Sequence, residues 1–339
     1  MRLEELGEFG FIRRVSQGCL VRPQGVERAI GDDAAAFALP SDQLTLVTTD
    51  LLVERVHFLR NATSAFNLGH KAMAVNLSDI AAMGGTPSEA FVSLAIPRDC
   101  PVEYLDGLYE GMKSLAARHA VNVLGGDTTG SQEDLVLNLT IVGHVRREEA
   151  LYRAGARPGD IVCVTGTVGD SRAGLQFVRE GASPPDAALR GLLDAHLLPR
   201  PHLEEGRFLA VSGAATAALD VSDGLSSDLM HLIEESRVGI RIHADRLPIS
   251  AALREFCARR GEDAVRFALA GGEDYVLAVT LRADRSEKVR QAFAARFGRP
   301  LYSMGEVTAS GELEFVTPDG LVETIRPTGW DHFGEEAAR

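Results

Sequence analysis

The stretch Leu44-Thr45-Leu46-Val47-Thr48-Thr49-Asp50 decides how the first half of this chain is built. β-Branched and apolar residues crowd the segment, and polar turn residues bound it, which is typical of a β-strand. The strand is expected to end at Asp50. A carboxylate therefore stands at the carboxyl end of this strand.

A helix is expected next, over residues 67–83. Apolar residues recur along it at helical spacing, and Gly84-Gly85 supplies a stop. Asp79 lies on the apolar face, four residues after Val75. Because an unpaired charge that faces the interior is very costly, Asp79 needs a cation or several hydrogen-bond donors. Neither helix capping nor solvation explains this aspartate, so a functional role is favoured there.

The rest of the chain alternates expected strands and helices, and it divides near residue 150. Strands are expected at 89–96, 121–124, 135–145, 161–164, 217–221 and 238–243, and helices at 101–119 and 225–236, followed by a helix, a strand and a helix that end near Arg296. Turn-forming residues concentrate at 153–160. With 339 residues, 45% of them hydrophobic, the chain is long enough for two α/β domains, expected at 1–150 and 151–339.

Composition narrows the possible partners. The formal net charge of -13 offers no basic surface to a nucleic acid, and it would repel an anionic nucleotide unless cations intervene. The four cysteines form no C-x-x-C pair, so neither a disulfide framework nor a zinc site is indicated. No signal segment and no apolar run of roughly 20 residues is seen, so a cytoplasmic protein without a membrane partner is expected.

Five short clusters combine aspartate with glycine, serine or threonine. They are Gly31-Asp32-Asp33, Thr48-Thr49-Asp50, Ser78-Asp79, Gly125-Gly126-Asp127 and Asp220-Val221-Ser222-Asp223-Gly224. Mg²⁺ prefers oxygen ligands and commonly bridges carboxylates to phosphates, while glycines let backbone amides approach those phosphates. Each cluster alone also fits a turn or a helix cap. If several clusters converge on one pocket, however, their mutual repulsion requires divalent cations.

Familiar nucleotide and hydrolase motifs are missing. The chain has no G-x-x-x-x-G-K-[ST] loop, no convincing G-x-G-x-x-G, no protein-kinase H-R-D or D-F-G pair, and no G-x-S-x-G elbow. The common ATP-binding folds are therefore excluded, and a Ser-His-Asp hydrolase is disfavoured.

Seven motifs occur in order along nearly the whole chain. They are G-D-D-A-A (31–35), T-T-D-L-L-V-E-R-V-H-F (48–58), N-L-S-D-I-A-A-M-G-G (76–85), G-G-D-T-T (125–129), D-V-S-D-G-L-S-S-D-L (220–229), G-G-E-D-Y (271–275) and G-W-D-H-F (329–333). This ordered set resembles the thiamine-monophosphate kinase family. The resemblance implies the two-domain fold shared with aminoimidazole ribonucleotide synthetase and selenophosphate synthetase. In that fold an N-terminal α/β domain binds ATP and Mg²⁺ and dimerises through its sheet, and a C-terminal α+β domain follows.

The resemblance also implies the reaction: ATP phosphorylates thiamine monophosphate to thiamine diphosphate by direct transfer of the γ-phosphoryl group, with several Mg²⁺ ions. By position, the implied metal ligands are Asp33, Thr48, Thr49, Asp50, Asp79, Asp127, Asp220 and Asp223; the implied ATP contacts are Tyr109, Gly126, Asp127, Arg153 and Ser222; and the implied thiamine-phosphate contacts are His57, Glu273 and Trp330. No covalent or general-base residue is expected, because a phosphate monoester with a second pKa of about 6 is already largely dianionic.

Some alternatives stay open. Arg55 stands two residues before His57, where a glycine or other small residue is expected, which leaves the loop shape in question. Without the resemblance, Trp330 fits a hydrophobic plug on the core, and His57 fits a loop histidine bonded to backbone. Another ATP-using enzyme of the same fold is one alternative function, although no reactive Cys and Lys pair supports selenophosphate synthetase. A nucleotide-binding regulatory module without turnover is another.

Overall fold

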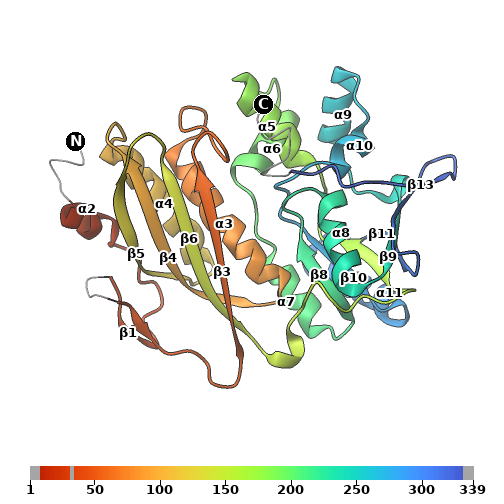
Figure 1. Ribbon diagram of the computed structural model, residues 1–339, viewed down its shortest axis with the longest axis horizontal. Helices are drawn as coiled ribbons and strands as arrows, with labels where there is room; N and C mark the ends of the chain where they lie inside the picture. Colours follow the sequence, from red (N-terminus) through yellow and green to blue (C-terminus); the bar gives the residue numbers. More distant parts are fainter. Residues whose placement is uncertain (1–7, 31–33, 331–339) are drawn as a thin grey trace. The chain divides into compact units, whose positions relative to one another are not determined.

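The computed structural model describes residues 8–30 and 34–330 (Figure 1). Contacts divide the described chain into two compact units, one formed by the residues up to 80 with 85–147, the other by 81–84 with 148–330. Asp33, an implied metal ligand, lies outside the described residues. Within the described part of the chain, no helix is long and apolar enough to cross a bilayer.

The first unit is a four-stranded sheet with α3 and α4 against one face (Figure 1). Its elements are α2 (Glu8–Val15), β1 (Val26–Arg28), β2 (Ala36–Phe37), β3 (Leu44–Val53), α3 (Ala65–Ala82), β4 (Thr86–Pro97), α4 (Val102–Arg118), β5 (Asn122–Ser131) and β6 (Val136–Val145). The strand order is β3-β6-β4-β5, in which β4 and β5 run parallel and the other pairs antiparallel. β1 and β2 form a separate antiparallel pair.

Two of the acidic clusters lie inside strands and not at their ends. The strand expected to stop at Asp50 continues to Val53, because β6 pairs with β3 along its whole length. Asp127 likewise lies within β5, where it pairs with Ser93 of β4. Pairing across the sheet therefore extends both strands past the residues that local composition marks as turns.

The two faces of β3 differ in burial. Leu46 and Leu52 are buried on the face that also carries Asp50. Val47 and Leu51 are 65% and 53% exposed on the opposite face. Since successive residues of a strand point to opposite sides, the first face packs in the core with the helices and the second presents apolar side chains outward.

The second unit is built on a seven-stranded sheet. Its elements are η1 (Arg147–Glu149, at the junction), β7 (Ile161–Val164), α5 (Asp170–Glu180), α6 (Ala187–Leu197), α7 (Leu203–Val211), β8 (Ala215–Asp220), α8 (Leu225–Ser236), β9 (Gly239–His243), η2 (Ala244–Arg246), α9 (Ala251–Arg260), α10 (Ala264–Leu269), β10 (Leu277–Leu281), α11 (Ala283–Phe297), β11 (Tyr302–Thr308), β12 (Leu313–Val316) and β13 (Val322–Thr324). The strand order is β13-β12-β9-β11-β7-β10-β8, and only the β12–β9 pair is parallel. This mostly antiparallel sheet confirms the α+β character expected of the C-terminal domain.

The core of the second unit surrounds its central strands. Every residue of β10 is buried. Apolar residues of α5, α6, α8 and α9 join those of the sheet in one buried cluster. The helices α7 and α11 pack together through Phe208 and Phe293, whose ring centres lie 5.7 Å apart. β8 is an edge strand of this sheet, and it ends at Asp220.

Two glycines let α3 and α4 touch backbone to backbone. A Cβ on Gly69 would lie 1.9 Å from the carbonyl oxygen of Leu108, and a Cβ on Gly111 would lie 2.0 Å from that of Phe66. Both distances are far inside van der Waals contact, so a side chain at either position would push the helices apart. The crossing fixes α3, which carries Asp79.

We expect Gly111→Ala to lower the free energy of unfolding by about 1–3 kcal/mol, because the added methyl group must displace a helix backbone. Gly191→Ala is the matched control inside α6, where an added Cβ meets nothing within 4 Å. That control should leave the protein as stable as before or stabilise it by up to about 1 kcal/mol. Urea unfolding followed by circular dichroism measures both. Wild-type stability of Gly111→Ala would contradict the close crossing.

Candidate functional site

Asp50 and Asp79 form an acidic pair on the helix-covered face of the first sheet. The Thr48 hydroxyl donates a hydrogen bond to the Asp79 carboxylate. Burial, and then the charge of Asp79, raise the pKa of Asp50 to about 7. A neighbouring negative charge disfavours the ionised form of a partly buried carboxylate, and a bound cation would relieve that cost. Thr48, Asp50 and Asp79 thus lie together, and their oxygen atoms suit Mg²⁺.

Thr49 and Asp127 lie apart from this pair. Thr49 is on the open face of the sheet, where its hydroxyl oxygen accepts a hydrogen bond from Asn138 Nδ2 at 2.9 Å. The strand registers put Asp127 on the same open face, but on β5 at the opposite edge of the sheet. Three strand spacings separate β3 from β5, about 14 Å. One ion therefore cannot be shared by Asp50 and Asp127 of the same chain.

The loop that follows β3 holds His57 in one tautomer. The Val53 amide donates a hydrogen bond to His57 Nδ1 at 3.0 Å, and the His57 amide donates to the Val53 carbonyl at 2.9 Å. Because Nδ1 accepts this hydrogen bond, it carries no hydrogen itself. In the neutral ring the hydrogen is therefore on Nε2. His57 can therefore offer Nε2–H to an anionic group. The alternative expectation, a loop histidine hydrogen-bonded to the backbone, also describes this ring correctly.

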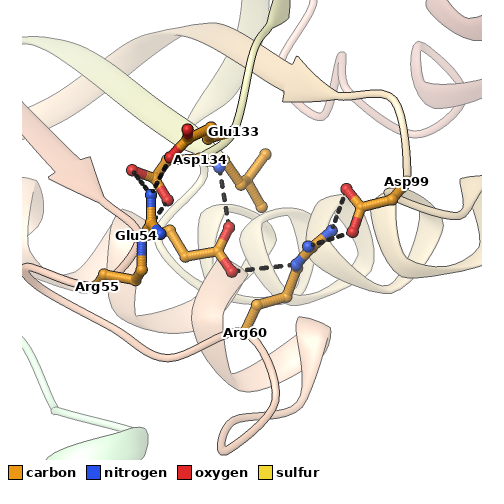
Figure 2. Close-up of polar contacts among 7 residues, drawn as sticks. Glu54, Arg55, Arg60, Asp99, Glu133 and Asp134 are labelled. Carbon is orange, nitrogen blue, oxygen red and sulfur yellow. Dashed lines mark hydrogen bonds and ion pairs between the residues drawn. The ribbon is translucent and has the colours of Figure 1, made fainter.

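Arg55 occupies a left-handed backbone conformation in this loop, with φ of 68°. Figure 2 shows its guanidinium group between two acids, with Nη2 2.9 Å from Glu133 Oε2 and Nε 2.7 Å from Asp134 Oδ1. A left-handed conformation favours glycine, which explains why a small residue is expected at this position. Here an arginine adopts that conformation, and ion pairs fix it to the segment between β5 and β6.

A second ion network fastens the same loop (Figure 2). Glu54 accepts hydrogen bonds from Arg60 Nε at 3.2 Å and from the Leu135 amide at 2.9 Å. Arg60 also reaches Asp99, 2.8 Å from its Nη2. The backbone around His57 is therefore tied to both the β4–α4 and the β5–β6 connections.

Tyr109, an implied ATP contact, lines a cavity of about 470 Å³ between α2 and α4. Its ring is largely buried and meets Phe11 edge to face, with ring centres 5.9 Å apart. Burial raises the pKa of the Tyr109 hydroxyl. Arg14 and Lys113 line the same cavity, but so do Asp106 and Glu110, and Arg14 Nε lies 2.5 Å from Asp106 Oδ1.

Gly126 and Arg153, two further implied ATP contacts, differ in how firmly the fold places them. Gly126 has φ of 148°, and a Cβ there would lie 1.7 Å from the Val92 carbonyl oxygen, so only glycine fits beside β4. Arg153 is exposed, and its carbonyl accepts a hydrogen bond from the Ser236 hydroxyl at 3.1 Å. Gly126 thus has a structural role of its own, whatever it binds.

Three segments that are distant in sequence meet at the end of β8. The Glu273 amide donates to the Ser222 carbonyl at 2.6 Å, and the Trp330 amide donates to the Asp223 carbonyl at 2.8 Å. A Cβ on Gly329 would lie 2.2 Å from that same Asp223 oxygen. The motifs at 220–224, 271–275 and 329–330 are therefore parts of one site. Trp330 is 44% exposed, so it is not a plug buried in the core.

A carboxylate that the sequence reasoning did not assign lies at the centre of this site. Asp228 is almost fully buried, and its Oδ2 accepts the amides of Asp223 and Gly224 at 3.2 and 3.0 Å. Burial, followed by the charges of Asp220 and Asp223, raises the pKa of Asp228 to about 8. Asp228 lies within the motif at 220–229, and its place in the first turn of α8 could have pointed to it.

The same helix adds a nitrogen donor. Ligand atoms of Asp223, Asp228 and His231 lie within 4.8 Å of one another, so these side chains could hold a metal ion. His231 follows Asp228 by three residues, which places both on one face of α8. The sequence reasoning missed His231, because a single histidine at this spacing is common in helices without a metal.

Comparison with known proteins gives consistent matches over both units. The model of the AIR synthase related protein N-terminal domain matches residues 31–145, and that of its C-terminal domain matches 157–317. The thiamine-monophosphate kinase of Aquifex aeolicus (strain VF5) is 37% identical over 98% of this chain and 100% of its own length. That of Escherichia coli (strain K12) is 38% identical over 96% of this chain and 98% of its own.

Comparison with solved structures finds the same family as the sequence comparison. The crystal structure of thiamine-monophosphate kinase from Stenotrophomonas maltophilia K279a has a TM-score of 0.82 and 36% identity, covering 91% of this chain and 96% of that one. The structure described as AaThiL complexed with AMPPCP and TMP has a TM-score of 0.78 and 33% identity, covering 98% of this chain and 99% of that one.

Two substitutions at Arg55 separate the backbone strain from the ion pairs. Arg55→Ala and Arg55→Gly both remove the contacts with Glu133 and Asp134, but only glycine relieves the left-handed conformation. We expect Arg55→Gly to melt about 2–4 °C above Arg55→Ala, which corresponds to the usual cost of that conformation. Differential scanning calorimetry compares them. Identical melting temperatures would contradict a strained residue 55.

Proposed function

The chain belongs to the thiamine-monophosphate kinase family, and we propose that its acidic clusters hold the Mg²⁺ ions on which its phosphoryl transfer depends. It catalyses the ATP-dependent phosphorylation of thiamine monophosphate to thiamine diphosphate. The relative solved with AMPPCP and TMP supports ATP as the co-substrate.

The observation that carries the metal proposal is the crowding of partly buried carboxylates in each unit. Burial and the charge of Asp79 raise the pKa of Asp50, and burial with the charges of Asp220 and Asp223 raises that of Asp228. Side chains of this kind persist in a fold when a cation offsets their repulsion. We assign Thr48, Asp50 and Asp79 to one group of ligands and Asp220 with Asp223 to another, Asp33 being implied by resemblance alone. When bound, Mg²⁺ would neutralise phosphate charge and orient the reacting groups.

The substrate contacts follow from the charges of the two ends of thiamine monophosphate. His57 can donate Nε2–H to the phosphate. The thiazolium ring is cationic, so a carboxylate and an aromatic face suit it, the latter adding about 0.5–2 kcal/mol. Glu273 and Trp330 supply these groups, and both are fastened by main-chain hydrogen bonds to the loop at 222–223. We therefore propose that this loop orders substrate contacts as well as metal ligands.

The transfer itself needs positioning more than activation. A phosphate monoester is already nucleophilic near neutral pH, so no residue has to remove a proton from it. We propose direct in-line transfer from ATP, with the protein supplying orientation and an environment that tolerates negative charge. The proposed contacts to ATP are Tyr109, Gly126, Asp127, Arg153 and Ser222.

We also propose a cytoplasmic homodimer, with residues 1–150 as the ATP-binding, Mg²⁺-binding and dimerisation domain and 151–339 as the α+β domain. The open face of the first sheet supports dimerisation, because Val47 and Leu51 expose apolar side chains there. A second copy packed against this face would cover these side chains.

Direct in-line transfer predicts inversion at phosphorus. ATP made chiral with oxygen isotopes at the γ-phosphorus should give thiamine diphosphate of inverted configuration, because a single displacement reverses the substituents. Phosphorus NMR after stereospecific derivatisation reads the configuration. Retention would require two displacements, and hence a phosphorylated enzyme intermediate.

Replacement of Asp79 by asparagine should remove activity while sparing the fold. We expect turnover to fall roughly 100-fold or more, because the variant loses a carboxylate but keeps its shape. Mg²⁺ should raise the melting temperature of the wild type more than that of the variant. Asp319→Asn, in an exposed turn, is the control and should behave as wild type. Near-normal turnover of Asp79→Asn would reject its role as a ligand.

A further inference from the structure

Glu273 lies in a segment that the fold holds in an unfavourable conformation. Glu273 and Tyr275 both have left-handed backbones, with φ of 62° and 51°. Residues other than glycine rarely adopt this conformation, and it persists only where surrounding contacts enforce it. Here the Glu273 amide is bonded to the Ser222 carbonyl, and the Tyr275 amide to the Val221 carbonyl at 2.8 Å. The backbone of Glu273 is therefore fixed before any ligand binds.

The carboxylate of Glu273 has a support of its own, formed by α5 and α6. His196 Nδ1 lies 3.2 Å from Glu273 Oε2 and 3.1 Å from the hydroxyl oxygen of Ser171. His196 is 5% exposed, whereas the Glu273 side chain is 28% exposed. One Nδ1–H can be shared between the two oxygens, and the ionised carboxylate is the stronger acceptor. A buried ring thus contacts a carboxylate that solvent reaches.

The packing of α5 against α6 brings His196 to this position. A Cβ on Gly174 of α5 would lie 2.2 Å from the Leu192 carbonyl oxygen and 2.7 Å from His196 Cβ, so the two helices touch through this glycine. The partly buried carboxylate of Asp274 accepts the Gly169 amide at 2.6 Å, just before the first turn of α5. The residue next to Glu273 is therefore fastened to the same helix that positions His196.

We propose that His196 is a positioning residue, which holds the Glu273 carboxylate in the orientation that receives the cationic ring of thiamine monophosphate. This inference rests on the proposed contact between Glu273 and that substrate. The described contacts of the His196 ring are with Glu273 and Ser171, and neither of these is a proposed ATP contact or metal ligand. Its loss therefore weakens the binding of thiamine monophosphate in the ground state and the transition state alike, and so raises one KM without lowering kcat.

Two replacements of His196 test this role. The amide nitrogen of asparagine falls near the place of Nδ1, and that of glutamine near the place of Nε2. His196→Gln should raise the KM for thiamine monophosphate roughly tenfold, the usual effect of losing a hydrogen bond to a charged group, with kcat and the KM for ATP unchanged. His196→Asn should stay within about twofold of wild type for all three constants, because it restores the donor.

Glu273→Gln distinguishes the proposed substrate contact of Glu273 from the proposed positioning role of His196. Alone it should raise the KM for thiamine monophosphate, and adding His196→Gln should raise it no further, because both act through one carboxylate. If Glu273→Gln leaves this KM unchanged, the substrate contact is wrong and the inference falls with it. If Glu273→Gln raises the KM but His196→Gln does not, the contact stands and only the positioning role is overturned.

Thermal melting tests whether the His196 variants change the KM only because they destabilise the fold. Both His196 variants should melt within a few degrees of wild type and keep the KM for ATP. If the asparagine and glutamine variants lose stability and kcat to the same extent, His196 is a packing residue and the positioning role is overturned.

Discussion

Repulsion between neighbouring carboxylates is the constraint on which the rest of this structure depends. Asp50 on β3 lies near Asp79 on α3, and Asp220 and Asp223 lie near Asp228 where β8 ends and α8 begins. Burial strengthens that repulsion, because less water screens the charges. A protein that needed only stability would not place these groups together. The surrounding structure therefore has to hold the carboxylates in place until cations and substrates neutralise them.

Around the loop at 222–224, main-chain groups make most of the contacts that fix the carboxylates in place. Amides at 223 and 224 donate to Asp228, and the carbonyls at 222 and 223 accept from Glu273 and Trp330. Glycines at the closest approaches, Gly126 and Gly329, let backbones meet where a side chain would collide. Backbone amides and carbonyls carry no net charge and do not titrate. Their hydrogen bonds therefore keep the loops in shape when the charge of the carboxylates changes.

Two residues in left-handed conformations show two ways to stabilise a strained loop. At Arg55 the conformation is accompanied by exposed ion pairs to Glu133 and Asp134. At Glu273 it is accompanied by main-chain hydrogen bonds, and the buried His196 contacts the side chain. Salt screens exposed ion pairs but hardly affects buried contacts. The ion pairs of Arg55 should therefore weaken with added salt, whereas the main-chain contacts of the Glu273 segment should not.

The sequence by itself determined the acidic and glycine motifs, their order, the two α/β halves and the reaction that their resemblance implies. None of this needs tertiary structure, because turn residues, helical spacing and motif order are read along the chain, and the resemblance rests on the motifs alone. It misjudged the end of β3 and the setting of Asp127, since both depend on pairing with strands distant in sequence. Only the tertiary structure separated Thr49 and Asp127 from Asp50, joined Glu273 and Trp330 to the Asp223 loop, and brought Asp228, His231 and His196 into view. These relations depend on the face of a strand, on the crossing of two helices and on burial, and none of them is fixed until the chain has packed.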